Sequence, residues 1–341
     1  MTASVIIVTL NRPDCVRRCL DCLRVQTLAP HQIIVVDGST DDLTRALCAE
    51  YPDVLYLRND RGVGHMTHSR NIGILRATGD VIAFIDDDAF AEPQWLENIL
   101  AAYDAPDVGA VGGRVHSTPR NVGTVPADQI GRFTANGIFL PNFWADCGKT
   151  IDVEHLMGCN MSFRRDVVAQ LGGFREFLIG ISGVGEDTEM CVRVRRSGFR
   201  MRFNPAAAVD HIGAPQVKGK RFDVRYAFFG GRNYNILLLR NFSLFAVVPW
   251  RYAIYSNVRG FARCVKHPSD FSRACAFAAG TLVGWTIALF MLIRHGTSPV
   301  RSDPAGIEIR RWLSNERPRS ASQTSTNSLP LSPAECPSSA S

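Results

Sequence analysis

The chain has 341 residues, of which 46% are hydrophobic and 21% are charged, and its formal net charge at pH 7 is +6. This length and apolar content are enough for one large or two small domains with a substantial core. The positive excess is modest and the basic residues do not interleave with stacking aromatics, so we expect no nucleic-acid partner.

The ten cysteines give neither a disulfide framework nor a zinc site. Cys19 and Cys22 form a lone C-x-x-C pair without a histidine nearby in the sequence, and most of the others are scattered. We therefore expect reduced thiols in a cytosolic protein. The first four residues lead directly into a strand-like run without a basic leader, so we also expect no signal peptide.

Four apolar runs alternate with three amphipathic segments at the start of the chain. The runs are rich in β-branched residues and predict buried strands over 4–10, 31–36, 54–57 and 81–85. The segments between them predict helices over 15–26, 43–51 and 69–77. Strands and helices with such short connections build a right-handed, doubly wound parallel sheet.

The fourth strand ends in three adjacent carboxylates, Asp86, Asp87 and Asp88. Ligands of parallel α/β sheets bind beyond the carboxyl ends of the strands. Three neighbouring carboxylates repel one another unless a cation lies among them, and oxygen ligands favour Mg²⁺ or Mn²⁺ over zinc. These ions usually bring a phosphate with them. The alternative is an acidic cap, with Asp88 at the start of a following helix.

Other polar residues should line the same rim of the sheet. Thr9 and Asn11 follow the first strand, Asp37 follows the second, and Arg70 lies on the adjoining helix. The sequence has no G-x-x-x-x-G-K-[ST] loop and no G-x-G-x-x-G after the first strand. A phosphate would therefore be held by the metal rather than by a glycine-rich loop.

Four segments in register resemble successive blocks of the family 2 glycosyltransferases. These segments are 5–12, 33–41, 69–73 and 84–88, and the resemblance extends over about residues 4–212. It points to members of the rhamnosyltransferase and glycan-assembly kind. It implies the GT-A fold, a nucleotide-sugar donor and inversion of the anomeric centre.

The middle of the chain is harder to interpret. Residues 114–150 lack periodicity but contain several aromatics, which is consistent with either an acceptor surface or a structural insertion. The following segment, 155–165, resembles the acceptor-side block of the family, although a plain structural strand would have the same spacing.

A second acidic centre, Glu186 and Asp187, stands at the start of a predicted helix. Inverting transfer needs one base to deprotonate the acceptor hydroxyl, and we predict that Asp187 is this base with support from Glu186. The alternative is a carboxylate that only stabilises the helix N-terminus. The resemblance also implies that His211 joins Asp86 and Asp88 at the metal. It places Asp86 and Asp87 at the donor together with Thr9, Asn11, Asp37 and Arg70.

The C-terminal part is basic and apolar. Eleven Lys and Arg lie between Arg193 and Arg240, which would suit acidic lipid headgroups or pyrophosphate as well as an ordinary solvated face. The segment 274–293 has no charged residue, so it can either span a bilayer or lie flat on one. Both arrangements place the protein on the cytoplasmic face of the cell membrane. Residues 296–341 are rich in Ser, Pro and Thr and predict a disordered tail.

Together these features predict an α/β protein of the GT-A type. Its doubly wound sheet would be mixed but mostly parallel, flanked by helices and followed by C-terminal apolar helices. The expected regions are a catalytic domain over 1–215, with a nucleotide-sugar half 1–113 and an acceptor half 114–215, a membrane-associated region over 216–295, and the tail.

The predicted activity is inverting, metal-dependent transfer of a sugar from a UDP- or dTDP-sugar to a hydroxyl of a glycan or lipid-linked acceptor, with Mn²⁺ or Mg²⁺. A nucleotidyltransferase on a related sheet is a second hypothesis, but it needs a glycine-rich, lysine-containing loop near residue 10. A third is a carbohydrate- or membrane-binding module with an inactive site. It would require a broken acidic centre, and both centres are intact.

Overall fold

The computed structural model describes residues 1–117, 119–121, 124–180, 184–215, 222–242, 245–295 and 304–313. Within these residues the apolar runs form a sheet of nine strands whose central members are buried on both faces. The strands are β1 (Ala3–Thr9), β2 (Gln32–Asp37), β3 (Val54–Arg58), β4 (Val81–Asp86), β5 (Ala89–Ala91), β6 (Val108–Ser117), β9 (Ile151–Val153), β10 (Asn160–Arg164) and β11 (Arg200–His211).

The sheet is mixed and mostly parallel in its first half, as predicted. Its order is β3-β2-β1-β4-β10-β6-β11-β5, with β9 paired to β11. The first four strands are parallel neighbours, whereas β10 enters antiparallel between β4 and β6. This insertion brings a segment that is distant in sequence next to the acidic end of β4.

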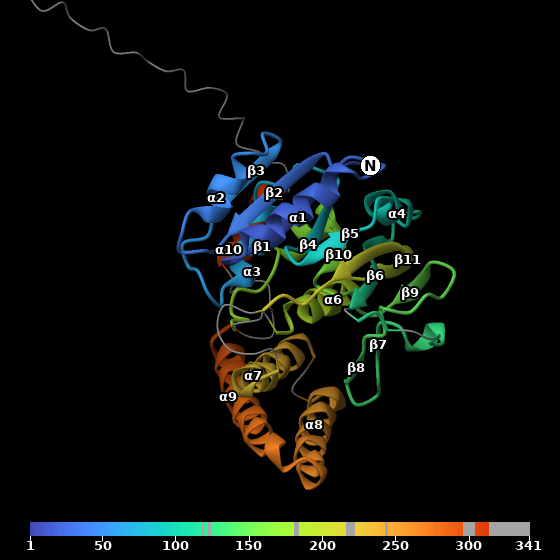
Figure 1. Ribbon diagram of the computed structural model, residues 1–341. Helices are drawn as coiled ribbons and strands as arrows, with labels where there is room; N and C mark the ends of the chain where they lie inside the picture. The colour runs from blue at the N-terminus through green and yellow to red at the C-terminus, as the bar shows by residue number, and fades with distance from the viewer. Residues whose placement is uncertain are drawn as a thin grey trace, which may run out of the picture.

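Helices flank the sheet (Figure 1), because each buries an apolar stripe against it. They are α1 (Pro13–Arg24), α2 (Leu43–Cys48), α3 (Met66–Ile74), α4 (Trp95–Ala101), α5 (Arg165–Leu171) and α6 (Glu186–Arg196). In the middle of the chain lie a 3₁₀ turn, Ala127–Gln129, and a small hairpin of β7 (Arg132–Phe133) and β8 (Phe139–Leu140). The described cysteines are free thiols, as predicted.

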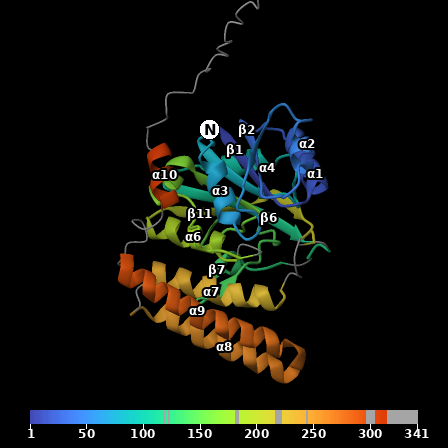
Figure 2. The same cartoon turned by 90° about the vertical axis from the view of Figure 1, so that its left-hand side faces the viewer.

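Three further helices form a separate layer beside the domain that contains the nine-stranded sheet. They are α7 (Val224–Asn241), α8 (Val247–Lys266) and α9 (Phe271–His295), the last two joined by the 3₁₀ turn Pro268–Asp270. Figure 2 shows the three helices running side by side. The backbones of α7 and α9 touch at glycines, since a Cβ added to Gly231 or Gly280 would collide with a carbonyl oxygen of the other helix. The predicted boundary after residue 215 falls next to residues outside the described ranges.

The prediction of a tail disordered from residue 296 onward is wrong over one segment. Residues Pro304–Leu313 form a helix, α10, that packs on α5 and α3. Ile309 is fully buried and reaches Gly173 beyond the end of α5, which explains why this short helix docks. Residues 296–303 and 314–341 lie outside the described ranges.

Candidate active site

The predicted rim residues meet at the carboxyl ends of three parallel strands. The register pairs Thr9 of β1 with Asp37 of β2, and Val8 with Asp86 of β4. Parallel strands in register end at one edge, so side chains from distant parts of the sequence converge there.

Asp87 is buried at this edge and is held by two residues of the first strand and its loop. Thr9 Oγ1 donates a hydrogen bond of 2.7 Å to Asp87, and Arg12 Nη2 lies 2.6 Å from the other carboxylate oxygen. Burial raises the pKa of Asp87 to about 7, even though Arg12 and Thr9 favour its ionised form. Arg12 lay within a recognised sequence block but was not predicted as a site residue.

Asp88 has three partners around its carboxylate. Its Oδ1 lies 3.2 Å from His211 Nε2, and its Oδ2 accepts hydrogen bonds from Arg12 and from the backbone N–H of Ala214. Burial disfavours the charge, but His211, Arg12 and Ala214 together lower the pKa of Asp88 to about 2. The helix-cap alternative is wrong, since the strand β5 follows Asp88 directly.

Asp37 and Asn11 form the next part of the rim. Asp37 is fully buried; its carboxylate accepts hydrogen bonds from the Ser39 backbone N–H and hydroxyl on one oxygen and from Tyr56 on the other. Asn11 adopts a φ of 53°, in the left-handed region, and donates its backbone N–H to Ser39. The Asn11 side-chain oxygen is buried with no hydrogen-bond partner among the described residues, so it is free to accept one from a ligand.

Arg70 connects this rim to the second acidic centre. Its guanidinium is buried, with Nη1 donating to Glu186 at 3.0 Å and Nη2 lying 3.7 Å from Asp86. It also donates to the carbonyl of Gly158. One arginine therefore bridges the carboxylate at the end of β4 and the carboxylate at the start of α6.

Asp187 occupies the first turn of α6, as predicted, with its side chain partly exposed. Its Oδ2 accepts the Gly158 N–H at 3.1 Å and its Oδ1 accepts the Thr188 N–H at 2.7 Å. These hydrogen bonds fix the direction of the carboxylate while part of it remains open to a substrate. A Cβ at position 158 would press on both Arg70 and Asp187, which explains the glycine there.

Glu186 is buried beside Asp187, and one of its oxygens has no hydrogen-bond partner among the described residues. Burial and the nearby charge of Asp187 raise the pKa of Glu186 to about 8, in opposition to the charge of Arg70. Near neutral pH this side chain is therefore largely protonated, which spares Asp187 a charged neighbour.

His155 was not predicted as a site residue, but it supports Asp187. Its Nε2 is 2.7 Å from the hydroxyl of Thr188, and burial lowers the pKa of His155 to about 4, so the ring is neutral. The aromatic rings of Phe133, Phe139 and Phe143 surround it, with Phe139 at 3.8 Å between centroids. These aromatics of the segment 114–150 thus pack around His155 next to the first turn of α6.

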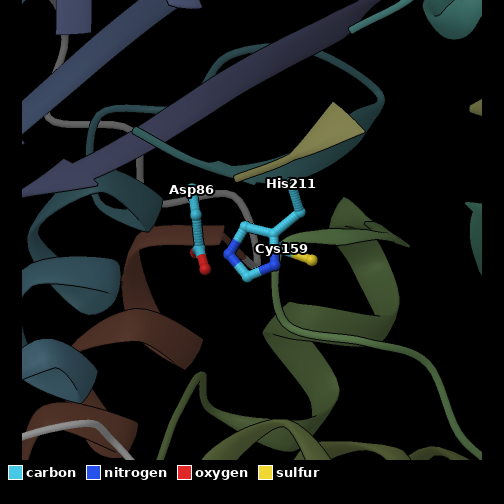
Figure 3. A group of neighbouring side chains, drawn as sticks. All are labelled: Asp86, Cys159 and His211. Atoms are coloured by element: carbon cyan, nitrogen blue, oxygen red, sulfur yellow. The ribbon is translucent and has the colours of Figure 1, made fainter. Parts of the chain in front are cut away.

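Asp86 and His211 come together with a residue that the sequence did not suggest, Cys159. The donor atoms of these three side chains lie within 4.8 Å of one another. Figure 3 shows the imidazole of His211 between the carboxylate of Asp86 and the sulfur of Cys159. Ligands of one ion at bonds of about 2.1 Å lie within about 4 Å of each other, so small side-chain adjustments would suit this group to a divalent cation.

Two family models match the chain. The model described as Glycosyl transferase family 2 matches residues 4–172, and the one described as the N-terminal domain of galactosyltransferase matches residues 141–214. The two matched ranges together contain the carboxylates of β4 and of α6. The chain is also 32% identical over 231 residues to the glucosyl-dolichyl phosphate glucuronosyltransferase of Haloferax volcanii, which covers 62% of this chain and 69% of that protein.

Two solved structures share the fold. One is the mannosyltransferase PcManGT of Pyrobaculum calidifontis in complex with GDP-Man and Mn²⁺, with a TM-score of 0.50 and 19% identity over 92% of this chain and 84% of that one. The other is GalNAc-T7 with UDP, GalNAc and Mn²⁺, with a TM-score of 0.57 and 16% identity over 86% of this chain and 58% of that one. They confirm the predicted GT-A type of fold.

Proposed function

Because the chain belongs to the family 2 glycosyltransferases, we propose that it transfers a sugar with inversion from a nucleoside-diphosphate sugar to a hydroxyl of a glycan or lipid-linked acceptor. The observation that carries this proposal is the bridge formed by Arg70 between Asp86 and Glu186. It joins a centre suited to a metal and diphosphate to one suited to a general base.

The donor lies along the rim of the sheet. Asp37 and Asn11 bind the nucleoside, since the buried Asp37 carboxylate is rigidly held and Asn11 offers an unused acceptor. Thr9 and Asp87 form the floor beneath the diphosphate. A UDP- or dTDP-sugar is the donor class of this proposal.

Asp86 and His211 would hold a divalent cation, with Asp88 beside His211. When bound, Mn²⁺ or Mg²⁺ neutralises charge on the departing diphosphate. Arg12 and Arg70 add two positive charges around the same position. The donor diphosphate therefore meets positive groups on several sides, which favours its departure.

Asp187 accepts the proton of the acceptor hydroxyl. The bond from the anomeric carbon to the diphosphate oxygen breaks as the bond to the acceptor oxygen forms on the opposite face, and the hydroxyl proton passes to the Asp187 carboxylate. The hydrogen bonds from Gly158 and Thr188 keep this carboxylate in one orientation. A correctly held base contributes about 10²- to 10⁴-fold to the rate.

The acceptor reaches the base from the layer of C-terminal helices. Tyr234 of α7 lies against Gly185 at the start of α6, and its ring stacks on Tyr252 of α8 at 4.6 Å. The homologue from Haloferax volcanii is named for a glucosyl-dolichyl phosphate, a lipid-linked glycan. A lipid-linked acceptor fits a base that stands this near to an apolar layer.

The outer face of α8 binds a membrane surface. Exposed apolar residues recur there every three or four positions, at Val247, Trp250, Ile254, Val258, Phe261 and Val265. Arg251, Arg259, Arg263 and Lys266 lie on the same helix, so anionic headgroups complement it. Phe290 and Ile293 add apolar area on α9.

The α9 helix lies flat on the membrane in this proposal, although Pro268–Arg294 is long and apolar enough to span one. Its inner side is bonded to α7, where Trp285 Nε1 donates to Asn235 at 2.8 Å. In turn α7 is bonded to the catalytic domain through Asn233, which donates to the carbonyls of Ile179 and Val184. A spanning α9 would have to leave these partners or pull them into lipid. In this proposal the flat helix lies on the cytoplasmic face of the membrane.

A screen of nucleotide sugars tests the activity. We expect release of nucleoside diphosphate that depends on Mn²⁺ or Mg²⁺ and is lost in Asp88→Ala, with transfer once a lipid-linked acceptor is supplied. Metal-independent release, or full activity of Asp88→Ala, would contradict the proposal. Flotation with vesicles tests the membrane surface: binding should need anionic lipid and fall in Val258→Glu, a substitution remote from the active site.

A further inference from the structure

We propose that Cys159 is a ligand of the metal ion together with Asp86 and His211, and that the site consequently prefers a transition-metal ion to Mg²⁺. This inference rests on the proposed metal-dependent function. It replaces Asp88 by a sulfur in the predicted ligand set.

The sheet itself brings the three ligands together. In the antiparallel pair of β10 and β4, Asn160 lies opposite Ile85, so the next residue on each side places Cys159 opposite Asp86. His211 ends β11, where it pairs with Ala89, three residues after Asp86. Three separate strand ends thus point their side chains at one position, and their donor atoms fall within 4.8 Å of one another.

The backbone on both sides of Cys159 is fixed, so the thiol is held at this position. Gly158 donates its N–H to Asp187. Asn160 donates its side-chain amide to the carbonyls of Arg114 and Ala207 and its backbone N–H to Met157. Cys159 is itself only 3% exposed. A ligand held in this way loses little freedom when it binds an ion.

Asp88 then takes a different role from the one predicted. Its Oδ1 already lies next to His211 Nε2, and its Oδ2 accepts hydrogen bonds from Arg12 and from the backbone N–H of Ala214. A histidine that binds a metal commonly uses its second nitrogen on a carboxylate, which fixes the orientation of the ring. We therefore assign Asp88 as a positioning residue for His211.

A mixed oxygen, nitrogen and sulfur set has a clear consequence for the ion. Mg²⁺ prefers six oxygen ligands and keeps several waters, whereas sulfur ligands favour softer transition metals. With Cys159 ligating, Co²⁺ and Mn²⁺ should bind better than Mg²⁺. Replacing the sulfur ligand by oxygen should reduce the difference in affinity between these ions and Mg²⁺.

Cobalt titration of the metal-free full chain tests the assignment. We expect a thiolate-to-cobalt charge-transfer band in the near ultraviolet that disappears in Cys159→Ser. Cys48→Ser is the matched control, since Cys48 is also 3% exposed but lies on α2, and it should keep the band. We also expect Co²⁺ affinity to fall about tenfold in Cys159→Ser while Mg²⁺ affinity stays within about twofold.

Absence of the band, or its survival in Cys159→Ser, would overturn the inference. Cobalt X-ray absorption of the unmodified protein keeps the test independent of how the variant folds, since a sulfur neighbour supports the ligand and its absence rejects it. Turnover separates the two proposals. Metal-dependent diphosphate release without sulfur ligation leaves the enzyme function standing, whereas sulfur ligation without turnover on any nucleotide sugar refutes the function alone. Asp88→Asn should weaken cobalt binding yet keep the band, and loss of the band would contradict its positioning role.

Discussion

The two acidic centres differ in how their charge is balanced. At the end of β4, Asp87 and Asp88 are almost fully buried and are countered by Arg12 and His211. At the start of α6, Arg70 pairs with Glu186, whereas Asp187 accepts hydrogen bonds from the backbone N–H groups of Gly158 and Thr188. The exposed fraction of the side chain is 21% for Asp187 but 4% for Asp88.

This difference supports the different tasks proposed for the two centres. A buried carboxylate cluster with fixed cationic partners is a rigid receptor for an ion and a diphosphate. A partly open carboxylate next to a neighbour whose pKa is raised to about 8 can take up a proton without competing against that neighbour.

Asp187→Asn should break the second centre alone. We expect transfer to fall by about 10²- to 10⁴-fold, because the amide cannot accept the hydroxyl proton. Donor affinity should be unchanged, since the proposal places the nucleotide along the other centre. Transfer rates and donor dissociation constants measured on one preparation check both points, and transfer at the parental rate would remove Asp187 from the mechanism.

Asp86→Asn should break the first centre. We expect Mn²⁺ affinity to fall by about 10- to 100-fold, because a charged ligand is replaced by a neutral one. Paramagnetic resonance of free Mn²⁺ measures this directly. Asp80→Asn is the matched control just before the opposite end of the same strand, where the Asp80 side chain accepts hydrogen bonds from Thr2. Equal losses in the two variants would argue against a metal at Asp86.

Arg12→Met leaves Asp87 without its ion-pair partner inside the protein. We expect a loss of about 1–3 kcal/mol in the free energy of unfolding. Burial already raises the pKa of Asp87 in the folded protein from 3.8 to about 7, and the loss of Arg12 would raise it further. The folded state therefore loses stability as the pH rises from about 3.8 through the raised pKa, and the variant loses more than the parent. The loss should therefore be smaller at pH 4, where the variant loses the contact with the ionised Asp88, than at pH 8, where it also loses the pair with the ionised Asp87.

Chemical unfolding at these two pH values measures the effect of Arg12. Arg17→Met is the control on α1, the helix that Arg12 precedes, since Arg17 pairs with Glu50 at the exposed surface and should matter little at either pH. If Arg12→Met unfolds like Arg17→Met, the buried pair with Asp87 does not support the fold.

Much of the first half of the fold could be predicted from local sequence. The runs at β1, β2 and β4 are continuous and apolar, which is the pattern of parallel strands that are buried on both faces. The polar residues that follow them, from Thr9 to Asp88, were assigned to one rim because parallel strands share an edge. The structure brings these predicted residues together.

The missed residues depend on contacts between distant parts of the chain. Cys159 becomes a neighbour of Asp86 only because β10 inserts antiparallel beside β4, and no periodicity indicates that pairing. His155 matters through a hydrogen bond to Thr188, which lies on another element. The sequence did not predict α10, because the Ser- and Pro-rich composition around it indicated disorder and only a few apolar residues pack this helix against the domain.

Glu186→Gln has the smallest expected effect, but it tests most directly whether Glu186 is protonated beside Asp187. Glutamine copies the shape of the protonated acid, and its carbonyl can still accept from Arg70. The pKa of Glu186 is raised from its ordinary 4.5 to about 8, so ionisation costs the parental protein stability as pH rises between these values, while glutamine does not titrate. The free energy of unfolding of the variant should therefore equal that of the parent at pH 4 and exceed it by about 1 kcal/mol or more at pH 8.5.

Unfolding titrations without divalent metal measure this gain. Glu189→Gln is the contrasting variant on the same helix, because Glu189 receives Arg193 on both oxygens and its loss should destabilise the fold at pH 8.5. If Glu186→Gln also loses stability at pH 8.5, the ion pair with Arg70 outweighs burial. Glu186 would then be charged beside Asp187, and the two acidic centres would no longer differ in the way that separates metal binding from proton transfer.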